Sequence, residues 1–170
     1  MPIEQHSPGL ERLVDVRQES EELARGFGGP SGPAEGPVWW QEGGYLLFSD
    51  IGNNRRMKWT PGVGVALAQE PTNEANGLTR DLQGRLIACE HLARRVTRQD
   101  PDGSITVVAN NYHSRRLNRP NDVVVKSDGS IYFTDPGLGR IESELDFCGV
   151  YRVSPDLGTA RGCQLPHQPP

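Results

Sequence analysis

Hydrophobic and polar positions along the chain alternate in short stretches separated by turn signals. Between Arg119 and Pro136, three consecutive valines at 123–125 and an Ile-Tyr-Phe run at 131–133 flank the turn sequence Ser-Asp-Gly. β-Branched and aromatic runs on either side of an Asp-Gly turn are typical of a β-hairpin. The same pattern occurs twice earlier, from Glu35 to Asp50 and from Asn76 to Glu90. The sequence therefore predicts three related hairpins.

The three hairpins align on their turn glycines. Their opening residues lie 41 and 45 positions apart (76−35 and 121−76), and each hairpin closes on an acidic residue that we interpret as a turn former. A repeat of about 40–50 residues with several short strands is typical of a β-propeller blade. Chance similarity between short hairpins is the alternative. The opening residues are Glu35, Asn76 and Asn121, the turn glycines are Gly44, Gly84 and Gly129, and the closing acids are Asp50, Glu90 and Asp135.

Each hairpin is followed by further strand-like segments. After the first, we expect strands at 56–59 and 63–68, and after the second, strands at 95–98 and 104–109. These additions give four strands per repeat, which is the architecture of a propeller blade. The third repeat continues to a strand at 149–153. The predicted fold is therefore all-β, with about three four-stranded blades.

The two ends of the chain differ from the repeats. We expect residues 1–21 to be a flexible segment and residues 22–158 to form the N-terminal half of a propeller. The stretch before the first repeat is compatible with a helix or a strand, and we expect a strand near Leu23 that closes the last blade. Residues 159–170 show no alternation and carry three prolines in the last five positions. We therefore expect an unstructured tail there, where a fourth strand should follow.

Composition narrows the possible partners and the compartment. A formal net charge of −4 and a pI near 5.6 give no basic patch, so nucleic acid is a disfavoured partner. The three cysteines show no CxxC spacing, which argues against a disulfide scaffold and for a reducing compartment. The N-terminus lacks the apolar core of a signal peptide, and no apolar run approaches the length of a membrane span. We expect a cytoplasmic protein without membrane contact.

The repeat register brings three oxygen-bearing side chains together. In a propeller the innermost strands of all blades surround one axial channel, so equivalent positions form a ring. Glu35, Asn76 and Asn121 are such equivalents. A carboxylate with amide oxygens suits a hard cation such as calcium, magnesium or manganese, and zinc is also possible. The alternative for each residue is structural, because asparagine before glycine or aspartate often forms a turn and Glu35 could be a loop acid.

Three motifs in order carry a resemblance to a known family. EGPVWW from Glu35, ANGLTRDLQGRLIACEH from Ala75 and RPNDVVVKSDGSIYFTDP from Arg119 resemble the senescence-marker-protein, gluconolactonase and luciferin-regenerating-enzyme family, and most of all its bacterial gluconolactonase-like branch. The resemblance covers about residues 22–158. It implies a six-bladed propeller with one divalent cation, most often calcium, in its axial channel, and metal-assisted hydrolysis of a sugar-acid or similar lactone. The sequence departs from the family in carrying about half of the blades, so the C-terminal half is missing.

The resemblance also implies roles for individual residues. Glu35 and Asn121 match two metal ligands. Arg119, Asn121, Asn76 and His91 are the expected substrate-binding residues, although a solvated loop position for Arg119 and a structural one for His91 are the alternatives. The other ligands and the aspartate that acts as general base belong to later blades, so no catalytic residue is assigned here. The expectation is therefore little or no lactonase activity for the chain alone.

Other readings of the sequence remain open. No GxSxG, P-loop or GxGxxG motif supports a different catalytic class. A non-catalytic binding or scaffold propeller would use the same fold without a metal. A non-functional gene fragment, truncated or shifted in frame after Thr159, would account for the unusual tail. Open blade edges would also allow self-association.

Overall fold

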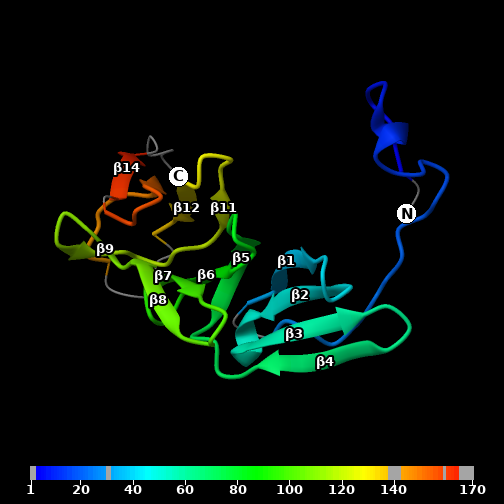
Figure 1. The fold of residues 1–170 in the computed structure, drawn as a ribbon, viewed down its shortest axis with the longest axis horizontal. Coiled ribbons are helices and arrows are strands. Elements are labelled where there is room, and N and C mark those ends of the chain that lie inside the picture. The colour runs from blue at the N-terminus through cyan, green and yellow to red at the C-terminus, as the bar shows by residue number, and fades with distance from the viewer. Residues whose placement is uncertain (1–2, 30–31, 138–142, 159, 165–170) are drawn as a thin grey trace.

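A computed structural model describes residues 3–29, 32–137, 143–158 and 160–164. Within these residues the chain forms three four-stranded antiparallel sheets and one two-stranded hairpin (Figure 1). Blade 1 contains β1 (Ala34–Trp40), β2 (Tyr45–Asp50), β3 (Arg55–Thr60) and β4 (Gly64–Gln69). Blade 2 contains β5 (Ala75–Arg80), β6 (Leu86–Glu90), β7 (Arg95–Gln99) and β8 (Ile105–Ala109). Blade 3 contains β11 (Val123–Val125), β12 (Ile131–Asp135), β13 (Gly149–Val153) and β14 (Ala160–Gln164).

The remaining elements connect or precede the blades. Short 3-10 helices occupy Leu10–Arg12 (η1) and Ile51–Asn53 (η2), and the hairpin of β9 (Asn111–Tyr112) and β10 (Arg115–Arg116) lies between blades 2 and 3. The N-terminal segment extends away from the sheets (Figure 1). In the described part of the chain, no helix has the length and apolar character needed to cross a membrane.

The blades stand side by side through their first strands. Each sheet runs in sequence order from its first to its fourth strand, and β5 contacts both β1 and β11. The predicted third hairpin is confirmed, because Val123 pairs with Phe133 and Val125 with Ile131. The structure therefore has the blade architecture of a propeller, with β1, β5 and β11 as the innermost strands.

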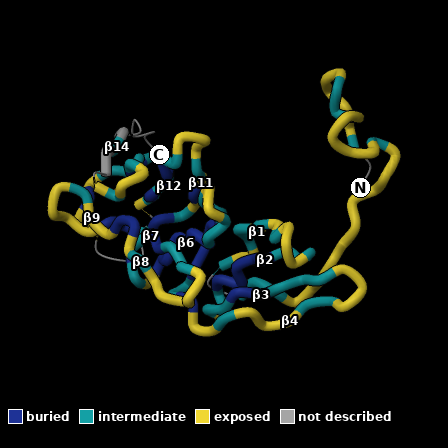
Figure 2. Tube along the Cα trace, viewed as in Figure 1, coloured by how far each residue is buried: buried dark blue, intermediate teal, exposed yellow. Residues whose placement is uncertain are grey.

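Apolar side chains pack between neighbouring blades, and the buried residues lie within the sheets rather than in the N-terminal segment (Figure 2). A larger cluster joins blades 2 and 3 through side chains such as Ile87, Phe133 and Tyr151. A smaller cluster joins blades 1 and 2 through Leu47 and Leu86. Burying one such side chain stabilises the fold by about 1.5–3 kcal/mol. The side chains packed between the blades therefore form the hydrophobic core.

Two expectations about the chain ends are wrong. Ala160–Gln164 forms β14 and pairs with β13, so blade 3 has its fourth strand; the rest of the predicted tail lies outside the described residues. An open strand edge offers unpaired backbone groups, and pairing with them does not require alternating side chains. No strand forms near Leu23, whose surface is 42% exposed. That segment pairs with none of the sheets and extends away from them (Figure 1).

The innermost strands of blades 1 and 2 carry an irregularity at the same repeat position. The pairing register shifts between Glu35 and Val38 in β1, and between Ala75 and Leu78 in β5. Such β-bulges bend a strand and redirect its side chains, and they are common at the rims of closed sheets. The bulges therefore influence the direction of the residues that open the first two repeats.

Candidate functional site

A cavity of about 410 Å³ lies where the innermost strands begin. All three blades contribute to this mouth cavity, because its lining comes from the starts of β1 and β5 and from the segment that enters β11. The structure thus brings together the three residues that open the repeats. The polar side chains of the lining are Glu35, Asn76, Thr79, Asn121 and Asp122.

Backbone hydrogen bonds fix the lining of the mouth cavity. The Gly77 N–H donates to the Asn121 carbonyl at 2.8 Å, which links blades 2 and 3. The Ser49 hydroxyl donates to the Asn76 carbonyl at 2.6 Å, which links blades 1 and 2. The Asn121 N–H donates to the Thr134 carbonyl at 2.8 Å. The side chains at the mouth therefore project from a backbone that is held from blade to blade.

Two carboxylates, Glu35 and Asp122, influence the charge of the mouth cavity. Burial, together with the neighbouring charge of Asp122, raises the pKa of the Glu35 carboxyl. The sequence marks Asp122 as a polar group at the start of its strand but gives it no role in the site, although it replaces the glycines that follow Glu35 and Asn76 in the other repeats. No ion pair is formed by either carboxylate among the described residues. A cation placed between them would relieve this repulsion.

The donor set of the mouth cavity fits a hard divalent cation. Among the described residues, no three His, Cys, Asp or Glu side chains converge in a way that could hold a metal. A metal at the mouth would therefore need amide oxygens beside the carboxylates. Glu35 and Asn121 supply one oxygen group of each kind, and calcium and magnesium accept such mixed oxygen sets.

His91 and Arg119 do not line the mouth cavity but lie directly behind Asn76. Arg119 Nη2 lies 3.1 Å from His91 Nδ1 and 3.5 Å from Glu74 Oε2. His91 Nε2 lies 3.1 Å from the Asn76 side-chain amide. Glu74, Arg119, His91 and Asn76 thus form a chain that ends at the cavity. Glu74 was not identified from the sequence because no local motif marks it.

The direction of these hydrogen bonds follows from the chemistry of arginine. A guanidinium can only donate, so His91 Nδ1 must accept and the neutral ring carries its proton on Nε2. The Asn76 atom nearest to His91 Nε2 is the amide nitrogen Nδ2, at 3.1 Å, so the structure does not turn the amide oxygen toward the ring.

Burial makes His91 a neutral residue. Its side chain is only 4% exposed, and burial together with the charge of Arg119 lowers the pKa of His91 to about 4. An imidazole with this pKa is uncharged at neutral pH and is a weak base. His91 is consequently suited to position Arg119 and Asn76 rather than to transfer protons.

The low pKa of His91 makes fold stability depend on pH. His91 takes up a proton near pH 6.5 in the unfolded state but only near pH 4 in the folded state. The stability that neutral His91 contributes is therefore fully present above pH 6.5 and is lost as the pH falls from 6.5 to 4. We expect a loss of about 2–3 kcal/mol between these pH values. Urea unfolding of the wild type and of His91→Gln over this pH range measures it. Parallel pH profiles for the two proteins would contradict the assignment.

The closing acids of the repeats have a larger role than the turn formation expected of them. Each is buried and accepts a hydrogen bond from the segment that leads into the innermost strand of its own blade. Asp50 accepts from the Gly28 N–H at 2.7 Å, Glu90 from the Asn73 amide at 2.9 Å, and Asp135 from the N–H groups of Asn118 at 2.7 Å and Arg119 at 2.5 Å. These acids therefore anchor the segments that present the site.

Comparison with known proteins agrees with the geometry of the blades and their mouth. The model of the SMP-30/gluconolactonase/LRE-like family matches residues 33–166. The chain belongs to this family. A gluconolactonase from Zymomonas mobilis is 33% identical over 174 residues, which cover 91% of this chain and 48% of that protein. The chain thus spans about half the length of this relative.

Solved structures show the same relationship. A gluconolactonase from Xanthomonas campestris is similar with a TM-score of 0.73 and 37% identity, over 79% of this chain and 48% of that one. A regucalcin from Agrobacterium tumefaciens, described as a calcium-binding protein, is similar in fold with a TM-score of 0.58 and 16% identity, over 77% of this chain and 42% of that one. The three blades described here correspond to part of the propeller in these relatives.

Proposed function

We propose that this chain provides the substrate- and metal-binding blades of a lactone-hydrolysing propeller. The observation that carries the proposal is the mouth cavity, where Glu35, Asn76 and Asn121 meet although they are separated by 41 and 45 residues (76−35 and 121−76). Similarity to gluconolactonases points to a sugar-acid lactone as the substrate class. The chain spans about half of those relatives. The complete activity therefore requires further blades, which the later repeats supply in the relatives.

Glu35 and Asn121 are the proposed ligands of one divalent cation, with calcium as the first candidate and magnesium, manganese and zinc as others. When bound, such a cation polarises an ester carbonyl and stabilises negative charge on its oxygen. Glu35 contributes the carboxylate, and the proposal is supported by its pKa, which burial and the charge of Asp122 raise. Asn121 contributes an oxygen without adding to the repulsion between Glu35 and Asp122.

Asn76 and Arg119 are the proposed substrate-orienting groups. Asn76 lines the mouth cavity, where its amide group can hydrogen-bond a lactone or hydroxyl group, and its Nδ2 lies 3.1 Å from His91 Nε2. Arg119 keeps a buried Nε that has no hydrogen-bond partner among the described residues, so it retains donor capacity near the site. Glu74 and His91 hold the guanidinium in place. Positioned donors of this kind fix the substrate relative to the reacting centre.

Calcium titration of the 170-residue chain by isothermal calorimetry tests the metal assignment. We expect a single weak site with a Kd of about 10⁻⁴–10⁻³ M, because the chain offers few of the six to eight oxygens that calcium prefers. Glu35→Gln should abolish this heat. Glu42→Gln is the matched control, since Glu42 is an exposed acid of the same blade that pairs with Arg80. Equal calcium affinity in all three proteins would contradict the assignment.

A further inference from the structure

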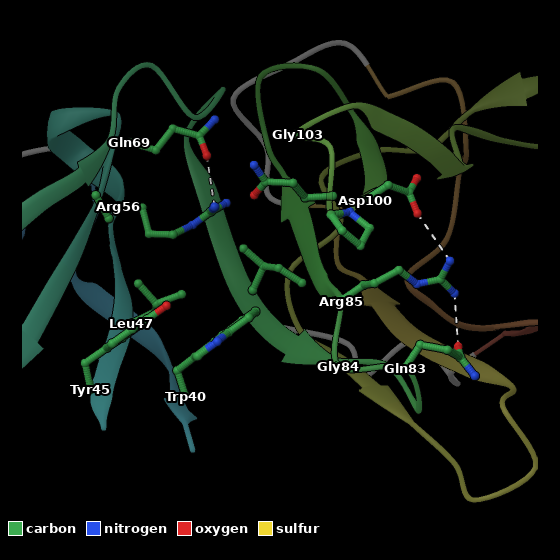
Figure 3. A pocket seen from close by; sticks show the side chains of 14 residues that line it. Trp40, Tyr45, Leu47, Arg56, Gln69, Gln83, Gly84, Arg85, Asp100 and Gly103 are labelled. Carbon is green, nitrogen blue, oxygen red and sulfur yellow. Dashed lines mark hydrogen bonds and ion pairs between the residues drawn. The ribbon is translucent and has the colours of Figure 1, made fainter. Parts of the chain in front are cut away.

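A second cavity of about 400 Å³ lies between blades 1 and 2 and shares no lining residue with the mouth cavity (Figure 3). One wall of this inter-blade cavity is apolar and includes Trp40, Tyr45 and Leu47 from blade 1 and Leu86 from blade 2. The rings of Trp40 and Tyr45 are stacked with an interplanar angle of 4°. Cavities of this size that combine an apolar wall with convergent polar groups are typical of small-molecule sites.

Arg56 is the most deeply buried charged residue of the inter-blade cavity, and the other polar residues of the lining are Gln69, Gln83, Arg85, Gln99 and Asp100. The surface of Arg56 is only 7% exposed, and its guanidinium points toward the cavity in Figure 3. Nη1 donates to Gln69 Oε1 at 3.0 Å, but Nε has no hydrogen-bond partner in the described part of the chain. No carboxylate of the described residues lies within ion-pair distance of Arg56. The charge of Glu90 acts on Arg56 from nearby, but no carboxylate of the described residues forms an ion pair with it, and a buried cation without such a pair is costly.

The neighbouring carboxylate and cations are already engaged. The carboxylate of Glu90 accepts from Arg95, Thr97 and Asn73. Arg85, on the opposite side of the cavity, pairs with Asp81 and Asp100. Arg85 therefore has carboxylate partners in ion pairs, whereas Arg56, the other arginine that lines the cavity, has none among the described residues.

The repeat shows that the fold does not require an arginine at this position. Arg56 lies opposite Ser49 on β2 and Gln69 on β4. In blade 2 the equivalent residue is Val96, which lies opposite Cys89 and Ala109. The register shifts directly after this residue in both blades. Blade 1 therefore places an arginine and a glutamine where blade 2 has a valine and an alanine.

We propose that the inter-blade cavity binds a small aromatic monocarboxylate, with its carboxylate on Arg56 and its ring against the apolar wall. A guanidinium donates to a carboxylate with matched geometry, and Gln69 is placed to support that contact. Burial lowers the pKa of Arg56 to about 10, which leaves the group protonated at neutral pH. The site belongs entirely to blades 1 and 2, so it does not depend on the proposed lactone hydrolysis.

Isothermal calorimetry of the 170-residue chain with 2-naphthoate tests the proposal. We expect a Kd of about 1 mM or below, as is reasonable for a ligand of this size. The uncharged 2-naphthamide should bind at least about tenfold more weakly, because it lacks the anionic group. Arg56→Val should weaken naphthoate binding at least tenfold, whereas Lys126→Val, which removes an exposed cation on blade 3, should not.

Circular dichroism and urea unfolding establish that the variants are folded. Arg56→Val reproduces the residue of blade 2 and is expected to be at least as stable as the wild type. If it does not fold, Arg56→Gln removes the charge while keeping a polar group, and the same tenfold loss is expected. Absence of naphthoate binding to the wild type, equal binding by the charge-free variants, or equal binding of the amide would overturn the proposal. Binding of inorganic phosphate in place of naphthoate would overturn the carboxylate assignment.

Discussion

Replacing Glu35 with glutamine should lower lactone turnover by at least about 100-fold. The expectation applies to a full-length gluconolactonase in which residues 33–166 of this chain replace the matching blades. Glutamine keeps the size of the side chain and one oxygen, but it removes the charge that would hold the cation. A loss of 100-fold corresponds to about 2.7 kcal/mol of transition-state stabilisation, which is within the contribution of a catalytic metal.

The assay follows hydrolysis of glucono-δ-lactone and metal affinity in the same preparations. Metal affinity and turnover should fall together in Glu35→Gln. The matched control is again Glu42→Gln, because its side chain is exposed and remote from the mouth cavity. A Glu35→Gln enzyme that turns over at the rate of the parent chimera would refute the role of this carboxylate.

Replacing Gly36 with alanine should destabilise the fold by about 4 kcal/mol. Gly36 has a φ of 64°, a conformation that costs other residues about 1–2 kcal/mol. A methyl group there would also overlap the Asn76 carbonyl oxygen and approach the Leu78 nitrogen to 3.1 Å. Overpacking of this kind typically costs a further 1–3 kcal/mol, roughly. The close approach of β1 to β5 depends on this missing side chain.

Gly44 provides a control with the same backbone conformation. Its φ is 63°, but an added methyl group would meet no heavy atom within 4 Å. Gly44→Ala should therefore cost only the conformational part, about 1–2 kcal/mol. Chemical denaturation of both variants separates the two contributions. Equal losses of stability at the two positions would contradict the inference that the close contact between β1 and β5 requires a residue without a side chain at position 36.

The sequence predicted most strands well because their signals are local. Alternating side chains and turn glycines defined the segment at 95–98 and the strand at 149–153, which the structure places at Arg95–Gln99 and Gly149–Val153. β14 could not be predicted in this way, because it forms by pairing with an available edge rather than by side-chain alternation. The strand expected near Leu23 does not form, because a strand-like local pattern is not sufficient without a neighbouring strand to pair with.

The candidate site was predictable only as far as the repeat register reached. The register placed Glu35, Asn76 and Asn121 at one channel mouth, and in the structure they line one cavity. It could not reveal contacts between side chains that are distant in sequence, such as the 28-residue separation of His91 and Arg119. Arg56 was hidden for a related reason, because a strand residue of mixed character gives no sign of whether its side chain is buried.

The three buried acids that hold the entry segments have a consequence for how such proteins arise. Asp50, Glu90 and Asp135 each make this connection within their own repeat. A single repeat copied by gene duplication would therefore arrive with the means to orient its own opening residue. New chemistry at the mouth would then need only a change of that residue, as the contrast between Glu35 and Asn121 illustrates. The number of repeats and the identity of the mouth residues can in this way evolve separately.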